Sequence, residues 1–271
     1  MDKKEVIMLN ASGIHYQVGK KQILKNISAE FHAGEFNMIL GPNGSGKSTF
    51  LKIFSGELQA SSGRIQLDGK KISGIPRQEL ARSRAVMSQH PELSFPLTVE
   101  EVIMMGRYPH FDFAPGKKDR QIMEEVMEKM NLLDFRERNY LSLSGGEKQR
   151  VQFARVLSQI WEKPQNNIRY LMLDEPLSSL DINYQHEFLR LAETILGKDT
   201  VVIAIIHDIN LAIQYAHRLF FLKEGELVAQ GKPSQVLNEQ LIYEVFGVSV
   251  RIVPNPVDQT PLVVFERQKQ E

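Results

Sequence analysis

The stretch Gly41-Pro-Asn-Gly-Ser-Gly-Lys-Ser48 decides how the rest of this sequence is interpreted. It matches the pattern G-x-x-x-x-G-K-[ST], in which glycines let backbone N–H groups curl around phosphate oxygens without Cβ clashes. The apolar run Phe36–Leu40 precedes it and the helical segment 47–55 follows it, which is the context that the motif requires. The helix N-terminus adds a partial positive charge. The stretch therefore predicts a loop that binds nucleotide phosphates.

Each residue type in this loop has a predicted task. Lys47 is expected to reach the β- and γ-phosphates, and Ser48 is expected to ligate Mg²⁺. A chance glycine-rich turn is the alternative interpretation, and the flanking strand and helix argue strongly against it. The predicted ATP-binding residues of the loop are Gly41, Asn43, Gly44, Ser45, Gly46, Lys47, Ser48 and Thr49.

Outward from the loop, short apolar runs rich in β-branched residues alternate with helical patterns. In 185–197, for example, the apolar residues keep the i, i+3, i+4 spacing of a helix face. This alternation predicts an α/β fold with a largely parallel sheet. The predicted strands are 36–40, 170–173, 200–206 and 219–222, and the predicted helices are 47–55, 145–160, 185–197 and 208–217.

Two regions depart from this alternation. Between about 92 and 144 the pattern is mostly helical, and Thr98-Val-Glu-Glu101 is a capping box that opens a helix. These features predict a helical subdomain inserted into the α/β core. Near the C-terminus, the extended runs Val248–Val253 and Leu262–Phe265 are separated by prolines and predict a small hairpin-like appendage.

Composition narrows the class of protein. The 271 residues contain 33 Lys and Arg, 33 Asp and Glu, and no cysteine. Disulfides and thiolate metal sites are therefore excluded, and the balanced charge argues against a nucleic-acid partner. The longest apolar run, Val201–Ile206, is far below the ~20 residues that cross a bilayer. We expect a soluble cytoplasmic chain that reaches a membrane only through a partner.

Two acids follow an apolar run at Leu171-Met-Leu-Asp-Glu175. A buried strand of this kind predicts that Asp174 holds the Mg²⁺ shell beside the phosphate loop. Glu175 comes next and points differently, so that it can polarise the attacking water as the catalytic base. Solvated acids at a strand end are the alternative, which the upstream phosphate loop makes much weaker.

The stretch Leu143-Ser-Gly-Gly-Glu147 resembles the signature sequence of the ABC ATPases. Its Ser hydroxyl and Gly amides at the start of a helix are suited to binding an anion. Taken alone, Ser-Gly-Gly is also an ordinary helix N-cap and turn. The resemblance implies a head-to-tail homodimer, in which Ser144, Gly145 and Gly146 of one chain close on the ATP of the other.

Other elements of the ABC set follow in order, and the resemblance covers roughly residues 5–245. Gln89 resembles the Q-loop glutamine, which senses Mg²⁺ and the attacking water and so has both a metal and a catalytic role. Asp181 resembles the D-loop aspartate at the dimer interface, and His207 the switch histidine that contacts the γ-phosphate. The family usually stacks adenine on an aromatic residue where this chain has Val18. Tyr16 shares that strand face, and it is either the base contact or an ordinary strand residue.

The resemblance implies the ABC ATPase fold, which is a P-loop NTPase (RecA-like) core with an inserted α-helical subdomain and an antiparallel β edge. We expect one nucleotide-binding domain over residues 1–271. Its predicted parts are a core over about 1–90 and 160–245, a helical subdomain over about 91–159 and an appendage over about 246–271. The implied cofactors are ATP and Mg²⁺.

A further resemblance concerns the cargo. The stretch Gln89–Val99, followed by Met105-Gly-Arg-Tyr-Pro-His110, is similar to bacterial importers of iron-siderophores, vitamin B12 and haem. Together with Ile160–Arg169 it is most similar to the ATPases of haem importers. This implies a membrane permease dimer as partner, a periplasmic or surface haem-binding protein acting indirectly, and a place on the cytoplasmic face of the plasma membrane. An importer of ferric siderophore or B12, and a soluble ATPase of iron–sulfur assembly, stay as alternatives. Direct haem binding by the seven histidines is not expected, since no pair has a persuasive ligand spacing.

Overall fold

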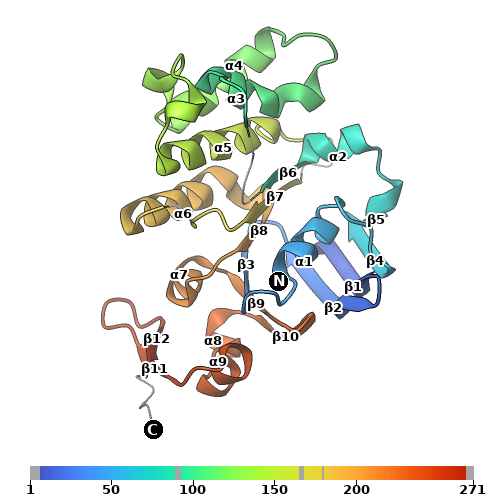
Figure 1. The fold of residues 1–271 in the computed structure, drawn as a ribbon, viewed down its shortest axis with the longest axis vertical. Coiled ribbons are helices and arrows are strands. Elements are labelled where there is room, and N and C mark those ends of the chain that lie inside the picture. The colour runs from blue at the N-terminus through green and yellow to red at the C-terminus, as the bar shows by residue number, and fades with distance from the viewer. Residues whose placement is uncertain (1–6, 89–92, 165–167, 179, 267–271) are drawn as a thin grey trace, which may run out of the picture. The chain divides into compact units, whose positions relative to one another are not determined.

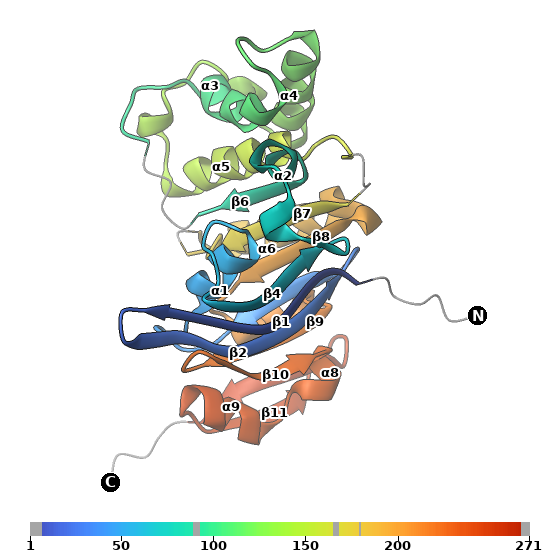
Figure 2. The same ribbon diagram turned by 90° about the vertical axis from the view of Figure 1, so that its right-hand side faces the viewer.

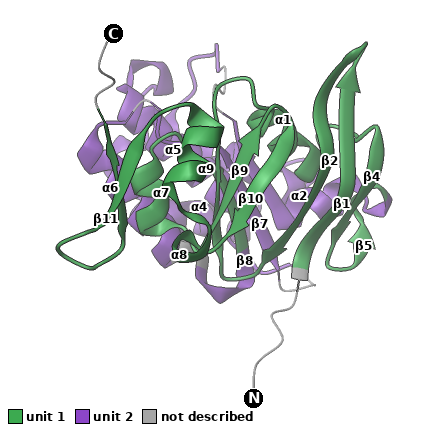
Figure 3. Cartoon of the chain, turned by 90° about the horizontal axis from the view of Figure 1, so that it is seen from below, with its two compact units in different colours: residues 1–73, 201–271 green, residues 74–200 purple. Residues whose placement is uncertain are grey.

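The computed structural model describes residues 7–88, 93–164, 168–178 and 180–266 (Figure 1). The chain forms two compact units, one of residues 1–73 with 201–271 and one of residues 74–200 (Figure 3). Both units contain strands and helices, so the predicted α/β class is confirmed. The boundaries of these two compact units differ from those of the predicted core and helical subdomain. The boundaries of the core and the subdomain stay a prediction.

The first unit contains a mainly parallel group of strands. Strand β3 (Phe36–Leu40) runs parallel to β8 (Thr200–Ile205) on one side and to β9 (Arg218–Lys223) on the other. Strand β10 (Glu226–Gly231) adds to β9 in the antiparallel sense. Every residue of β3 and of β8 is buried, which is typical of parallel strands covered on both faces. These strands confirm the predicted runs at 36–40, 200–206 and 219–222.

A second, antiparallel sheet in this unit has the order β2-β1-β4-β5, and Figure 2 shows its strands β2, β1 and β4. Its strands are β1 (Ile7–Val18), β2 (Lys21–His32), β4 (Ser62–Leu67) and β5 (Lys70–Lys71). It confirms the antiparallel β edge that the family resemblance implied.

Buried phenylalanine rings join β2, β9 and helix α1 (Lys47–Phe54). The rings of Phe31 and Phe220 stack with centroids 4.8 Å apart, and those of Phe50 and Phe54 stack at 4.2 Å. All four side chains are fully buried. Removing one such ring costs about 3–5 kcal/mol, so this cluster is a main anchor of the helix that follows the phosphate loop.

The C-terminal part of the first unit contains the hairpin predicted as an appendage. Helices α7 (Ile209–Tyr215), α8 (Pro233–Val236) and α9 (Glu239–Phe246) precede a hairpin of β11 (Val250–Pro254) and β12 (Pro261–Phe265). Helix α7 packs against β12, and α9 packs against β11. The hairpin confirms the prediction from the two extended runs.

The second unit pairs β6 (Arg84–Met87) with β7 (Arg169–Asp174) in the parallel sense. Helix α5 (Gly145–Gln159) packs against α2 (Arg77–Ser83), α3 (Val99–Met104) and α4 (Lys117–Lys129). Helix α6 (Ile182–Leu196) completes the set. Short 3₁₀ turns are η1 (Ile72–Gly74), η2 (Met105–His110), η3 (Leu133–Phe135), η4 (Tyr140–Ser142) and η5 (Gly197–Asp199).

The helical pattern predicted between 92 and 144 is confirmed by α3 and α4. The predicted capping box is also present, because Thr98 N donates to Glu101 Oε2 at 2.7 Å and Glu101 N donates to Thr98 Oγ1 at 3.3 Å. Among the described residues, no helix combines the length and the apolar character that crossing a bilayer requires.

Polar contacts fasten η2 and the end of α5 inside this unit. The side chain of Arg107 is 1% exposed and donates to Asp119 Oδ1 at 3.0 Å, to the carbonyl of Ser158 at 2.7 Å and to Glu162 Oε2 at 2.6 Å. A buried cation with three such partners is satisfied, so it holds η2 in one position. Nearby in sequence, the indole of Trp161 donates to Glu125 Oε2 at 2.8 Å.

Candidate nucleotide-binding site

The phosphate loop ends in a helix N-terminus that no side chain caps. Gly46 is the N-cap of α1 with φ of 102°, and it supplies no side-chain hydrogen bond to the first turn. No acidic residue lies in that turn either. The first backbone N–H groups of α1 therefore offer donors and a partial positive charge to an anion such as a phosphate.

Close backbone packing fixes the shape of this loop. A Cβ atom at Gly41 would lie 2.1 Å from the carbonyl oxygen of Leu222, and one at Gly46, where φ is 102°, would lie 3.1 Å from the carbonyl oxygen of Ile23. The backbone also ties the loop to the β9–β10 turn, because Gly225 N donates to the carbonyl of Ser45 at 3.0 Å. Any other residue at 41 or 46 would therefore strain the loop.

Two polar side chains of the phosphate loop, those of Lys47 and Ser45, are buried. Lys47 is buried, and its Nζ donates to the carbonyls of Gly41 at 2.9 Å and Pro42 at 3.0 Å. The hydroxyl of Ser45 is buried and has no hydrogen-bond partner among the described residues. An ammonium and a hydroxyl placed in this way fit the oxygens of a polyphosphate, which would replace the carbonyls as acceptors for Lys47. Ser48 and Thr49 follow in the first turn of α1, and Asn43 is exposed in the turn before it.

Two other predicted residues lie in the same unit as the loop. His207 is exposed just after β8, where Ile206 N donates to the carbonyl of Ile39 at 3.2 Å. The carboxyl ends of parallel strands meet at one edge, which is where α/β proteins bind ligands, so His207 shares the edge of the phosphate loop. Tyr16 is half-buried on β1 opposite Leu24, which packs on Gly46.

The second unit carries the predicted carboxylates. Asp174 is the last residue of β7 and is buried, and Glu175 follows with φ of 51°. A non-glycine residue in this left-handed region is strained, and such strain clusters at functional sites. The turn is held by Ser178, whose N and Oγ donate to the carbonyl of Glu175 at 3.3 and 3.1 Å. Gln149 of α5 reaches the next carbonyl, that of Pro176, at 2.8 Å.

The signature stretch forms the N-terminus of α5 and is closed by its own capping box. Ser144 N donates to Glu147 Oε2 at 2.7 Å, and Glu147 N donates to Ser144 Oγ at 3.3 Å. The hydrogen bonds from the Ser144 backbone and hydroxyl hold the pKa of the Glu147 carboxyl below its usual value. Ser144 and Gly145 are exposed, as a surface that meets another molecule requires.

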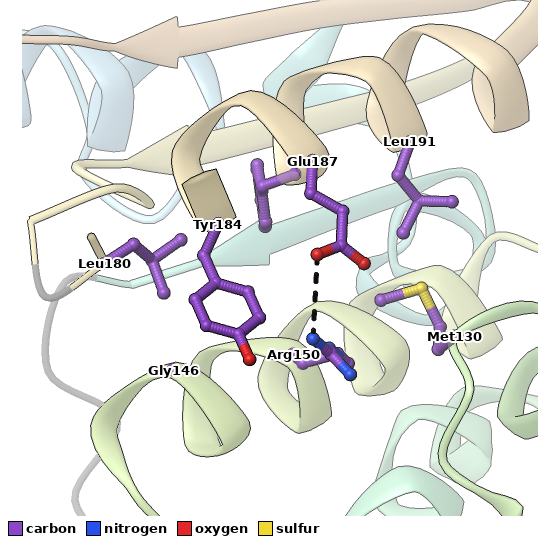
Figure 4. A pocket seen from close by; sticks show the side chains of 8 residues that line it. Met130, Gly146, Arg150, Leu180, Tyr184, Glu187 and Leu191 are labelled. Carbon is purple, nitrogen blue, oxygen red and sulfur yellow. Dashed lines mark ion pairs between the residues drawn. The ribbon is translucent and has the colours of Figure 1, made fainter. Parts of the chain in front are cut away.

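A pocket beside this N-terminus is lined by residues of both α5 and α6 (Figure 4). The guanidinium of Arg150 lies over the Tyr184 ring, 5.4 Å from its centroid, and pairs with Glu187 at 3.8 Å. Gly146 and Leu180 line the same pocket. The signature helix and the segment after Glu175 are thus packed together within one unit.

Asp181, the predicted D-loop aspartate, is the N-cap of α6 and accepts from Tyr184 N at 3.0 Å. Helix α6 therefore begins at Ile182, three residues before the apolar periodicity predicted. Gln89 lies outside the described residues. Gln149 could not be predicted from the sequence, because the run Glu147–Arg150 is entirely polar and does not reveal which residue faces inward.

The site residues are divided between the units. Tyr16, the phosphate loop and His207 belong to the first, and Asp174, Glu175, the signature and Asp181 belong to the second. Their joint action on one nucleotide is a proposal.

Comparisons with known proteins agree on the family. A family model described as ABC transporter matches residues 24–178. The chain is 43% identical over 257 residues, or 95% of its length and 94% of the relative's, to the hemin import ATP-binding protein HmuV of Gloeobacter violaceus.

Solved structures extend this likeness to the fold. A metal-chelate type ABC transporter in an inward-facing conformation matches with a TM-score of 0.82 at 21% identity, over 97% of this chain and 98% of that one. A dimeric ATP-binding cassette in a post-hydrolysis state with ADP and phosphate matches with a TM-score of 0.70 at 28% identity, over 83% of this chain and 98% of that one. The predicted fold and family are confirmed, and the chain belongs to the ABC transporter family.

Proposed function

We propose that this chain is the ATP-hydrolysing subunit of an ABC importer that energises the uptake of haem through a membrane permease. The observation that carries ATP binding is the uncapped N-terminus of α1, with Lys47 buried beside it. The cargo is inferred from the similarity to a hemin import ATP-binding protein along nearly the whole chain.

In this proposal the phosphate loop holds the triphosphate, and Tyr16 contacts the base. Ser48, Gln89 and Asp174 hold Mg²⁺, and their hydroxyl, amide and carboxylate oxygens are the donors that this ion prefers. When bound, Mg²⁺ neutralises charge on the phosphate oxygens during transfer. The loop itself contributes the amide and ammonium donors.

Glu175 acts as the catalytic base, with Gln89 and His207 as the other catalytic residues. Its left-handed backbone sets it apart from Asp174, so that one carboxylate serves the ion and the next serves the attacking water. The exposed Ser144 and Gly145 serve the ATP of a second copy, with Asp181 beside them at the interface, and a related cassette is known as a dimer.

Glu175→Gln tests the hydrolytic part. The amide keeps the size of the side chain but is not basic, so kcat should fall by about 10²–10⁴ while ATP still binds. An ATP-bound dimer should then accumulate and be visible by size-exclusion chromatography. Turnover near that of the wild type would refute the role of Glu175.

The permease contact is proposed for the second unit, in which two aromatic side chains close together in the sequence are exposed. Tyr108 is 59% exposed and Phe113 fully so, and they flank His110. The ion pair of Arg107 with Asp119 holds η2 in place. Through this contact the subunit lies on the cytoplasmic face of the plasma membrane, and a haem-binding protein on the other side acts only indirectly.

Reconstitution tests the cargo. Proteoliposomes holding this chain and its cognate permease should take up haem with ATP use, and a loaded haem-binding protein should raise the ATPase rate. The isolated chain should show no stoichiometric haem absorbance. Transport of a ferric siderophore or cobalamin instead of haem would overturn the cargo and keep the mechanism. Failure of any permease to associate would favour an ATPase of iron–sulfur assembly.

A further inference from the structure

The segment that carries His207 is anchored on both sides within the first unit. Before it, Ile206 is bonded to the carbonyl of Ile39 at the end of β3. After it, Asp208 caps α7, and its Oδ1 accepts from the backbone N–H of Asn210 at 2.8 Å. The position of the imidazole therefore depends on where the first turn of α7 is held.

Asn210 attaches that first turn to the C-terminal hairpin. Its Nδ2 donates to the carbonyl of Val263 at 3.1 Å, and its Oδ1 accepts from Val263 N at 2.9 Å. The side-chain amide thus pairs with β12 as a neighbouring strand would. Val263 is 2% exposed, so without Asn210 both of its backbone groups would lose this pairing in a buried place.

The hairpin is itself a fixed support. On β11, Ile252 N donates to Glu239 Oε1 of α9 at 3.3 Å, and Val250 is buried. Helix α9 packs against both β9 and β11. Strand β12 is therefore held independently of α7, and it can define where α7 begins.

We infer that Asn210 is a positioning residue for His207, and that the C-terminal hairpin takes part in ATP hydrolysis through it. This inference rests on the proposed role of His207 at the γ-phosphate. A misplacement of about 1 Å in a catalytic group can cost about 10² in rate. Loss of the Asn210–Val263 pair frees the first turn of α7 to shift, and His207 shifts with it.

The test compares the two sides of the hairpin in the subunit reconstituted with its permease. Asn210→Ala removes both bonds to β12, whereas the control Glu239→Ala removes the bond to β11 and leaves α7 untouched. Asn210→Ala should lower kcat about tenfold or more, with ATP affinity within about twofold of the wild type. Glu239→Ala should keep kcat within about twofold. An equal loss in both variants would overturn the inference, since it would report a loosened hairpin.

A double-mutant cycle with His207→Ala shows whether the effect passes through the imidazole. In that background Asn210→Ala should cause no further loss, because the residue that it positions is gone. An equal fractional loss in both backgrounds would overturn the inference. Wild-type turnover in His207→Ala would refute the proposed role of His207, and a loss in Asn210→Ala would then contradict positioning through it.

A second variant covers the case in which Asn210→Ala does not fold. Asn210→Asp keeps the shape of the side chain and the acceptor for Val263 N, but it sets a carboxylate against the Val263 carbonyl. Its kcat should also fall, in a variant that urea unfolding shows to be folded. Wild-type kcat in a folded Asn210→Asp would overturn the inference.

Discussion

The phosphate loop and the signature both place glycines at the start of a helix, yet the two helix ends are built in opposite ways. The N-terminus of α1 has no side-chain cap and no acid in its first turn. The N-terminus of α5 is filled by the reciprocal bonds of Ser144 and Glu147. The first therefore has no side-chain cap that an anion would have to displace. In the second, the Glu147 carboxylate already accepts from Ser144 N, and the Ser144 hydroxyl oxygen already accepts from Glu147 N.

Their glycines differ as well. A Cβ at Gly41 would collide with the backbone, at 2.1 Å from the Leu222 carbonyl oxygen. At Gly146 the nearest atom to such a Cβ is Leu180 Cδ2 at 3.6 Å, an ordinary contact. The chain itself therefore requires glycine in the phosphate loop but not at this signature position. In the proposed dimer, the requirement at Gly146 comes from the partner's ATP.

Alanine at each glycine should separate these two requirements. Gly41→Ala should destabilise the fold by more than about 3 kcal/mol, because backbone must move to admit the methyl group. Gly146→Ala should leave stability equal or slightly higher, since alanine favours a helix by up to about 1 kcal/mol. Its ATPase activity should nevertheless fall. Urea unfolding and turnover check both, and full activity in Gly146→Ala would remove the contrast.

Lys47→Ala should weaken ATP binding at the phosphate loop and leave the signature unchanged. Charge-assisted bonds contribute about 1.5–3 kcal/mol, so ATP affinity should fall about 10–150-fold. The fold should survive, because the bonds that Lys47 donates to the carbonyls of Gly41 and Pro42 lie within the loop itself. Lys52→Ala, in the last turn of the same helix, is the matched control and should bind ATP normally. Equal losses in both variants would indicate a nonspecific charge effect.

Mixing damaged chains sharpens the comparison further. Ser144→Arg should block the signature, and Lys47→Ala the phosphate loop, so neither homodimer is active. In an equal mixture about half of the dimers are mixed, and each has one intact site, which restores about a quarter of the sites. The ATPase rate of the mixture measures this. A signature that worked within its own chain would give no recovery.

The smallest effect concerns the cap of α5. Glu147→Ala should cost about 0.5–1 kcal/mol of stability at neutral pH. Because the pKa of Glu147 is lowered in the folded state, this contribution is present above its usual value of 4.5 and disappears as pH falls through the lower folded value. Urea melts between pH 7 and pH 3 check this. Glu101→Ala removes the same kind of cap from α3 and should leave ATP hydrolysis unchanged.

Local chemistry explains how much of the fold and site could be predicted from the sequence. The phosphate loop, the end of β7 and the capping box of Thr98 and Glu101 each depend on a few consecutive residues, and the structure has these elements where the sequence predicts them. Helix α6 begins three residues before the range that the apolar spacing predicts. Apolar spacing indicates which face of a helix is buried, whereas the N-cap Asp181 indicates where the helix begins.

Contacts between residues far apart in the chain could not be predicted from the sequence. Asn210 and Val263 are 53 positions apart. A single asparagine in a helical pattern does not reveal that its side chain pairs with the edge of a strand. Gln149 was hidden in the same way by its polar neighbours. Such pairs follow from tertiary packing, which local rules do not contain.

The bond between Trp161 and Glu125 has a practical consequence for spectroscopy. The chain contains one tryptophan, so its fluorescence reports only on the end of α5 and the face of α4 that it meets. Because the natural sequence has no cysteine, a single thiol introduced on the first unit could carry an acceptor dye without background labelling. Energy transfer between the two would then follow, in an otherwise unaltered protein, how the units move as nucleotide binds and leaves.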